Sequence, residues 1–83
     1  MNIKVTTIVK EGHSPEVNQK LNNRLNVLNR AIHAYEEHDI KASVHVNAIA
    51  EEEDFKIMLN IQSENKSFKA LLDEKLNELV NKR

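Results

Sequence analysis

The chain has 83 residues, a net charge of −1 and no cysteine, which limits it to one small domain without disulfides or thiolate metal sites. We therefore expect a single domain over residues 1–83, and the charge provides no overall attraction to nucleic acid or to an anionic membrane. The N-terminus lacks the apolar segment of a signal peptide, and no apolar run approaches the roughly 18 residues of a membrane span. The sequence thus predicts a cytoplasmic protein without a membrane partner.

The first predicted element is a strand over residues 2–10, where apolar and polar residues alternate. A period of two places alternate side chains on opposite faces of a strand. The side chains expected toward the helices are Ile3, Val5, Thr7 and Val9, and those expected on the opposite face are Lys4, Thr6, Ile8 and Lys10.

A long helix is predicted from Ser14 to about Glu36. The Ser14 hydroxyl is a good N-cap, Pro15 loses no hydrogen bond in the first turn, and Glu16 lies at the positive end of the helix dipole. Apolar residues then recur every three or four positions, at Val17, Leu21, Leu25, Leu28, Ile32 and Tyr35. The polar segment 37–39 ends this pattern.

The second half of the chain predicts two strands and a second helix. Alternation returns over residues 40–50 and 55–62, separated by the acidic segment 51–54, which is typical of a solvated hairpin loop. Helical spacing resumes over residues 68–82, with Ser67 as the expected N-cap.

The order of these elements predicts the fold class. A strand, a long helix and another strand form a parallel crossover, and the third strand pairs with the second as a hairpin. We expect an α+β two-layer sandwich of β-α-β-β-α order, with a three-stranded mixed sheet and both helices on one face. The other face of the sheet then meets water or a partner.

The open sheet face is the first candidate for function. Ile8, Ile49 and Met58 are expected to form a small apolar centre within a basic and amide-rich rim, an arrangement typical of interaction surfaces; an ordinary solvated face is the alternative. The candidate binding residues on this face are Lys4, Lys41, His45, Lys56 and Met58.

The polar face of the first helix is the second candidate. It carries Asn18, Asn22, Asn23, Asn26 and Asn29. With Lys20 and Arg24 these amides suit contacts to phosphates or to a protein groove, although a bias toward asparagine in the whole chain explains most of them.

No pattern predicts catalysis. The histidines lack the spacing of metal ligands, and the chain has no glycine-rich phosphate loop and no nucleophile-elbow motif. We expect a protein that is not an enzyme and has no metal or cofactor.

Two stretches carry a family resemblance: the strand and Ser14-Pro15-Glu16 helix start, and the segment 63–71 with Phe68, Ala70 and Leu71. With the order of elements, they resemble the ribosome hibernation-promoting factor family, also called ribosome-associated inhibitor or sigma-54 modulation proteins. The resemblance implies binding in the decoding region of the small ribosomal subunit. The basic residues it implies as contacts include Lys20, Arg24, Lys69, Lys75 and Lys82.

The chain departs from that family in three respects. Three strands are predicted where the family usually has four, Lys66-Ser67-Phe68 replaces its Asp-Met-Tyr, and the net charge is not basic. A second hypothesis is therefore a small protein-binding module of phage or mobile-element origin that uses the open sheet face or a strand edge. Either protein is expected to suit a homodimer, since a sheet of three strands leaves two edges to pair.

Overall fold

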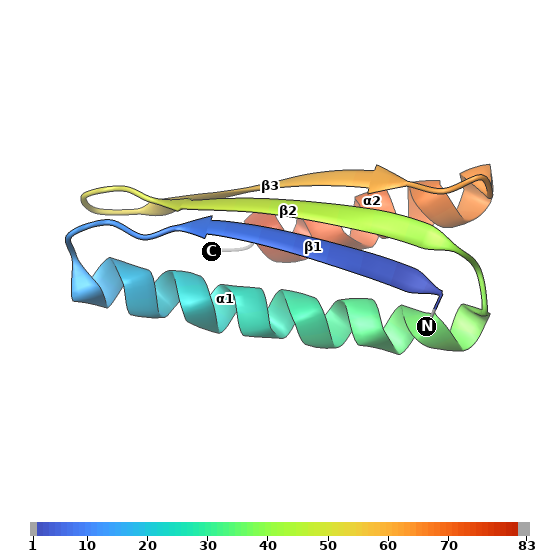
Figure 1. Ribbon diagram of the computed structural model, residues 1–83, viewed down its shortest axis with the longest axis horizontal. Coiled ribbons are helices and arrows are strands. Elements are labelled where there is room, and N and C mark those ends of the chain that lie inside the picture. The colour runs from blue at the N-terminus through green and yellow to red at the C-terminus, as the bar shows by residue number, and fades with distance from the viewer. Residues whose placement is uncertain (1, 82–83) are drawn as a thin grey trace.

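The computed structural model describes residues 2–81 and confirms the predicted α+β sandwich of β-α-β-β-α order. A three-stranded sheet forms one layer and two helices form the other (Figure 1). The elements are β1 (Ile3–Lys10), α1 (Pro15–Ala34), a short 3₁₀ helix (Tyr35–His38), β2 (Ala42–Ala50), β3 (Phe55–Gln62) and α2 (Lys66–Asn81). No helix within residues 2–81 is long and apolar enough to cross a lipid bilayer.

The strands lie in the order β1-β2-β3, with β1 parallel to β2 and β2 antiparallel to β3. The register pairs Ile3 with Ala42 and Val44 with Ile61, and all four side chains are buried on the helix side. The core is completed by the apolar stripe of each helix. Its helical members are Val17, Leu21, Leu25, Leu28, Ile32, Phe68, Leu72 and Leu76.

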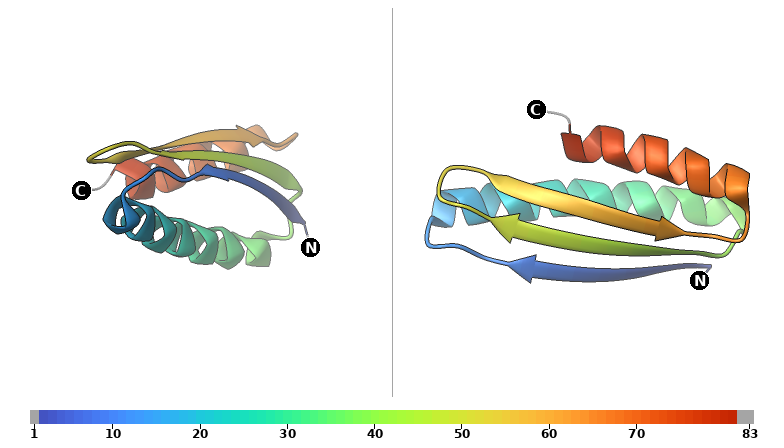
Figure 2. Two further views of the ribbon diagram at one scale, coloured as in Figure 1. Left: turned by 60° about the vertical axis from the view of Figure 1, so that its left-hand side comes forward. Right: turned by 90° about the horizontal axis from the view of Figure 1, so that it is seen from above.

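The helices cover β2 and β3 and leave β1 at the border. The helix side of β2 carries the small residues Ala42, Ala48 and Ala50, which let a helix approach the central strand closely. α1 packs against β2 and α2, and α2 packs against β3. The right-hand view of Figure 2 shows β1 lying to one side of both helices.

The expected burial along β1 is therefore wrong beyond Ile3. Val5 and Val9 face the helix side of the sheet, yet they are 37% and 38% exposed, and Thr7 between them is also exposed. These side chains point to the correct face but lie beyond the edge of the helix layer.

Both helix starts are capped by side chains. Ser14 is confirmed as the N-cap of α1, because its Oγ accepts from the backbone N–H of Val17 at 3.3 Å. The expected cap Ser67 is wrong: α2 begins at Lys66, and Asn65 Oδ1 accepts from the backbone N–H of Phe68 at 3.0 Å. Asparagine is among the best N-caps, and this one starts the helix two residues earlier than predicted.

The far end of α1 tightens rather than continuing as a regular helix. The α-helix ends at Ala34 and the chain forms the 3₁₀ helix up to His38, although the sequence predicts one helix to about Glu36. Asp39 then adopts a left-handed conformation with φ of 54°, a conformation that aspartate tolerates better than most residues. This turn brings the chain back to the start of β2 beside β1.

Candidate binding surface on the open sheet face

The strand register gathers the outward side chains into four cross-strand rows. We call the face that they form the outer face. From one end to the other, the rows are Lys4-Ser43-Gln62, Thr6-His45-Asn60, Ile8-Asn47-Met58 and Lys10-Ile49-Lys56. None of these residues is acidic.

The expected apolar centre is present on this face. Ile8 is 63% exposed and Met58 is 58% exposed, and they flank Asn47 in the same row. Ile49 lies two residues further along β2 and is also exposed. Large apolar side chains exposed together within a polar rim are typical of contact surfaces.

The lysines of the outer face are largely without acidic partners. Lys4, Lys10 and Lys41 are exposed and make no ion pair within residues 2–81. Lys56 Nζ lies 4.0 Å from Glu51 Oε1 with both side chains exposed, a geometry worth little in water. Their charge is therefore accessible to a ligand.

Two of these lysines border a hollow of about 860 Å³ at the end of the sheet where β1 and β2 begin. Lys4, Lys41, Ser43 and Gln62 contribute ammonium, hydroxyl and amide groups to its wall, and Glu64 is the acidic residue of the lining. Such donors suit an anionic oxygen, because charge-assisted hydrogen bonds from lysine are stronger than neutral ones.

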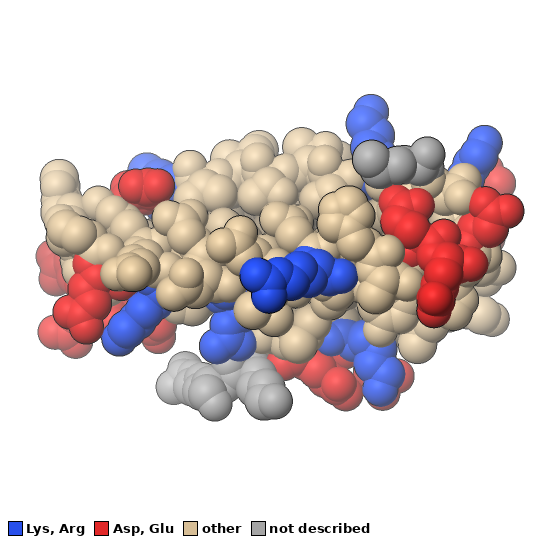
Figure 3. Space-filling view, turned by 90° about the horizontal axis from the view of Figure 1, so that it is seen from below, with Lys and Arg blue, Asp and Glu red and all other residues tan. Residues whose placement is uncertain are grey.

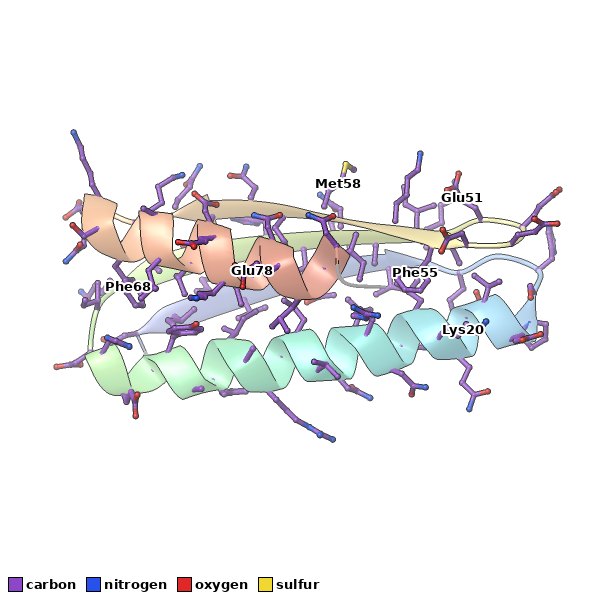
Figure 4. The ribbon with its side chains drawn as sticks, turned by 180° about the vertical axis from the view of Figure 1, so that it is seen from behind. Lys20, Glu51, Phe55, Met58, Phe68 and Glu78 are labelled. Atoms are coloured by element: carbon purple, nitrogen blue, oxygen red, sulfur yellow. The ribbon has the colours of Figure 1, made fainter. Side chains whose placement is uncertain are left out.

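A second hollow of about 700 Å³ lies beyond the C-terminal end of α2, between β3 and α1. Figure 4 shows Phe55 pointing into this space and Met58 pointing away from the helices. The structure thus brings four of the sequence-predicted residues to one hollow. They are Lys20, Arg24, Lys56 and Met58, accompanied by Glu51 and Asp54. Acidic and basic groups face each other here, so this hollow has no strong preference for an anion.

Three of the predicted contact residues on the helices, Lys20, Arg24 and Lys69, have partners within the molecule. Lys20 Nζ lies 3.7 Å from a carboxylate oxygen of Glu16, and Lys69 Nζ lies 2.7 Å from that of Asp73. Lys75 is exposed on α2, and Lys82 lies outside the described residues. Figure 3 shows both signs of charge on the helix side of the molecule.

Arg24 ties the two helices together. Its Nη1 donates to the backbone carbonyl of Leu79 at 2.6 Å, so the guanidinium satisfies a carbonyl in the last turn of α2. A cation in that position also complements the negative end of the helix dipole. This residue therefore has a clear structural role in holding α2 against α1.

Glu36 is a residue that sequence reasoning missed. Its carboxylate accepts from the backbone N–H groups of Asn2 at 3.0 Å and Ile3 at 3.1 Å, which fastens the 3₁₀ helix to the start of β1. These hydrogen bonds, the one from Asn2 foremost, hold the pKa of Glu36 below its ordinary value of 4.5. No local signal indicates this contact, because the partners lie far apart in the sequence.

No group of three histidine, cysteine or acidic side chains within residues 2–81 is placed to hold a metal ion.

Comparison of the chain with models of known families, with curated protein sequences and with solved structures finds no match. The arrangement of charge on the outer face is therefore the principal guide to function.

Proposed function

We propose that this protein is a non-enzymatic RNA-binding protein that associates with the small ribosomal subunit through the outer face of its sheet. The observation that carries the proposal is the composition of that face, whose rows hold three lysines, one histidine and no acidic residue, with Lys41 next to the first row. Lysine ammonium groups and side-chain amides are common donors to phosphate oxygens.

The proposed contact differs from the one implied by the family resemblance. The resemblance implies helix residues such as Lys20 and Lys69, but these pair with acidic residues one turn away. Lys4 and Lys41 have no such competitor within residues 2–81 and border one hollow. The two lysines of the sheet therefore lack the ion-pair partner that Lys20 and Lys69 have.

The mechanism requires a measurable dependence on salt. Binding that neutralises phosphates releases counterions, and about three contacts give a slope of roughly −2 to −3 in log affinity against log salt. Affinity is then expected to fall about 16- to 64-fold between 50 and 200 mM salt. The protein would then act by occupying an RNA-lined site and excluding other ligands from it, and it would catalyse no reaction.

The test is co-sedimentation of the protein with purified ribosomes on sucrose gradients at these two salt concentrations. The double variant Lys4→Gln, Lys41→Gln is expected to lose binding. Its matched control is Lys20→Gln, Lys69→Gln, which removes the same charge from the helix side and is expected to retain binding. Wild-type protein left at the top of the gradient at low salt, or equal loss in both variants, would contradict the proposal.

A second candidate function is recognition of another protein through the apolar centre, and the exposure of Ile8 and Met58 favours it. In that case binding depends weakly on salt and is lost in Met58→Asp, whereas the variant without Lys4 and Lys41 still binds. A pull-down with these two variants separates the two functions.

A further inference from the structure

Within residues 2–81, no strand pairs with the outer edge of β1, and the backbone of this edge has a definite pattern. The N–H of Ala42 on β2 donates to the carbonyl of Asn2 at 3.1 Å, and Ala42 is in register with Ile3. In a parallel ladder, alternate residues direct both backbone groups to the same neighbour. The even-numbered residues of β1 therefore face β2, while Ile3, Val5, Thr7 and Val9 direct their N–H and C=O groups away from the sheet.

Part of this edge is already occupied. The outward N–H of Ile3 donates to Glu36 Oε1 at 3.1 Å, so the carboxylate covers the first outward position. Val5, Thr7 and Val9 remain, with no backbone partner on that side within residues 2–81. Their side chains are uncharged and exposed on the helix side.

β1 carries little protection against pairing on this side. Natural edge strands are usually protected by charged side chains such as lysine, by inward-pointing charges, proline or bulges, or by a covering element. β1 is regular over Ile3–Lys10 and contains no proline or glycine, and neither helix lies beneath it (Figure 2). Its charged residues, Lys4 and Lys10, lie on the outer face.

We propose that β1 pairs with the β1 strand of a second copy of this chain, antiparallel and centred on Thr7, to make one continuous six-stranded sheet. The second copy fits because the free positions are self-complementary. Centring on Thr7 places Val5 opposite Val9 of the other copy and Thr7 opposite itself. Each such pair exchanges two backbone hydrogen bonds, and the position closed by Glu36 is left out.

The same backbone pattern determines on which side of the combined sheet the helices of each copy lie. Outward groups must meet outward groups, so odd positions of β1 oppose odd positions, and opposed residues share a face of the sheet. Both helix layers therefore lie on the same side. They are separated by the two β1 strands that neither helix covers, and both outer faces join into one surface.

This register also opposes Lys4 to Lys10 of the other copy on the outer face. Like charges directly opposite each other in a sheet are destabilising, and salt screens them. Dimer affinity is therefore expected to rise with salt, whereas the proposed RNA binding falls with salt. The dimer does not depend on the proposed function, and the two can fail separately.

The test compares two adjacent positions of β1 by sedimentation equilibrium over a range of protein concentrations. Thr7→Lys places two lysines across the twofold axis and is expected to weaken dimerisation at least tenfold. The control Thr6→Lys lies one residue away on the outer face and is expected to leave a dimer. A wild-type protein that is monomeric at all concentrations up to about 1 mM, or equal dimerisation in both variants, would overturn the proposal.

Single-cysteine variants test the register directly, because the chain has no cysteine of its own. In the proposed dimer, Thr7→Cys brings two Cα atoms to about 5.5 Å, which a disulfide spans. Thr6→Cys leaves its two copies about 7–8 Å apart on the diagonal. Mild oxidation is expected to cross-link the first variant and not the second, and the reverse result would exclude this register.

Discussion

Replacement of Asn18 by alanine should destabilise the protein, although this residue lies in a helix where alanine is intrinsically favoured. Asn18 Oδ1 accepts from the backbone N–H of Gly12, and Asn18 Nδ2 donates to the carbonyl of the same residue, both at 2.9 Å. Gly12 in turn lies close to Ala50, since an added Cβ would be 3.1 Å from the Ala50 carbonyl oxygen. The asparagine thus holds the β1–α1 turn against the end of β2.

The magnitude follows from these two bonds. Each contributes about 0.5–1.5 kcal/mol net, so their loss costs about 1–3 kcal/mol. The higher helix propensity of alanine offsets roughly 0.5 kcal/mol of this loss of stability. We expect the free energy of unfolding to fall by about 0.5–2.5 kcal/mol, and each kcal/mol lowers Tm by about 4–8 °C in a domain of this size.

The matched control is Asn22→Ala, one turn further along α1. Asn22 is exposed and its side chain makes no hydrogen bond within residues 2–81, so this variant is expected to be as stable as the wild type or up to about 0.5 kcal/mol more stable. Urea unfolding followed by circular dichroism measures both. If Asn18→Ala is as stable as Asn22→Ala, the structural role assigned to the asparagine is wrong.

Two further variants test the contact between Glu36 and the start of β1, and the packing of α2 in the core. Glu36→Gln is expected to lower Tm at neutral pH. Because the pKa of Glu36 is lowered in the folded protein, the difference in Tm between wild type and variant stays constant above about pH 4.5 and narrows as the pH falls through the lowered pKa. Thermal melts at several pH values measure this difference, and a difference that widens in acid would contradict the prediction. Leu72→Ala removes a fully buried side chain and is expected to lower the free energy of unfolding by about 2–5 kcal/mol. Leu71→Ala, at the half-buried neighbouring position, is expected to lower it less in the same urea titration. Equal losses of stability would contradict the difference in burial between the two leucines.

The sequence predicts the faces of β1 correctly and its burial incorrectly. Alternation reports which side of a sheet a residue points to, and on that count Val5, Thr7 and Val9 are placed correctly. Burial depends on where the helices lie over the sheet, and that position is set by packing against the alanines of β2. No pattern within β1 itself carries this information, so its exposed edge emerges only from the tertiary structure.

The site shows a similar division between local and distant information. The partners of Lys20 and Lys69 lie one helical turn away, so the pairing with Glu16 and Asp73 was available from spacing alone. The hydrogen bond from Arg24 to Leu79 joins residues of two different helices, so spacing within one helix could not predict it. The face on which the Lys4, His45 and Met58 side chains lie was predicted correctly, because the period of two in each strand determines it, whereas the strand register that aligns them was not.

A net charge of −1 is compatible with the phosphate contacts that we propose for Lys4 and Lys41, because the acidic loop lies far from these two lysines. The acidic loop Glu51–Asp54 lies beyond one end of β2, whereas Ser43, in the row of Lys4, lies at the other. Glu51 follows Ser43 by eight positions, which is about 26 Å at 3.3 Å per residue. The Debye length is about 8 Å at physiological ionic strength and about 30 Å at 0.01 M salt. The loop therefore repels a ligand at Lys4 and Lys41 only in dilute salt. At physiological salt, the RNA binding that we propose depends on the local charge around these lysines rather than on the net charge of the chain.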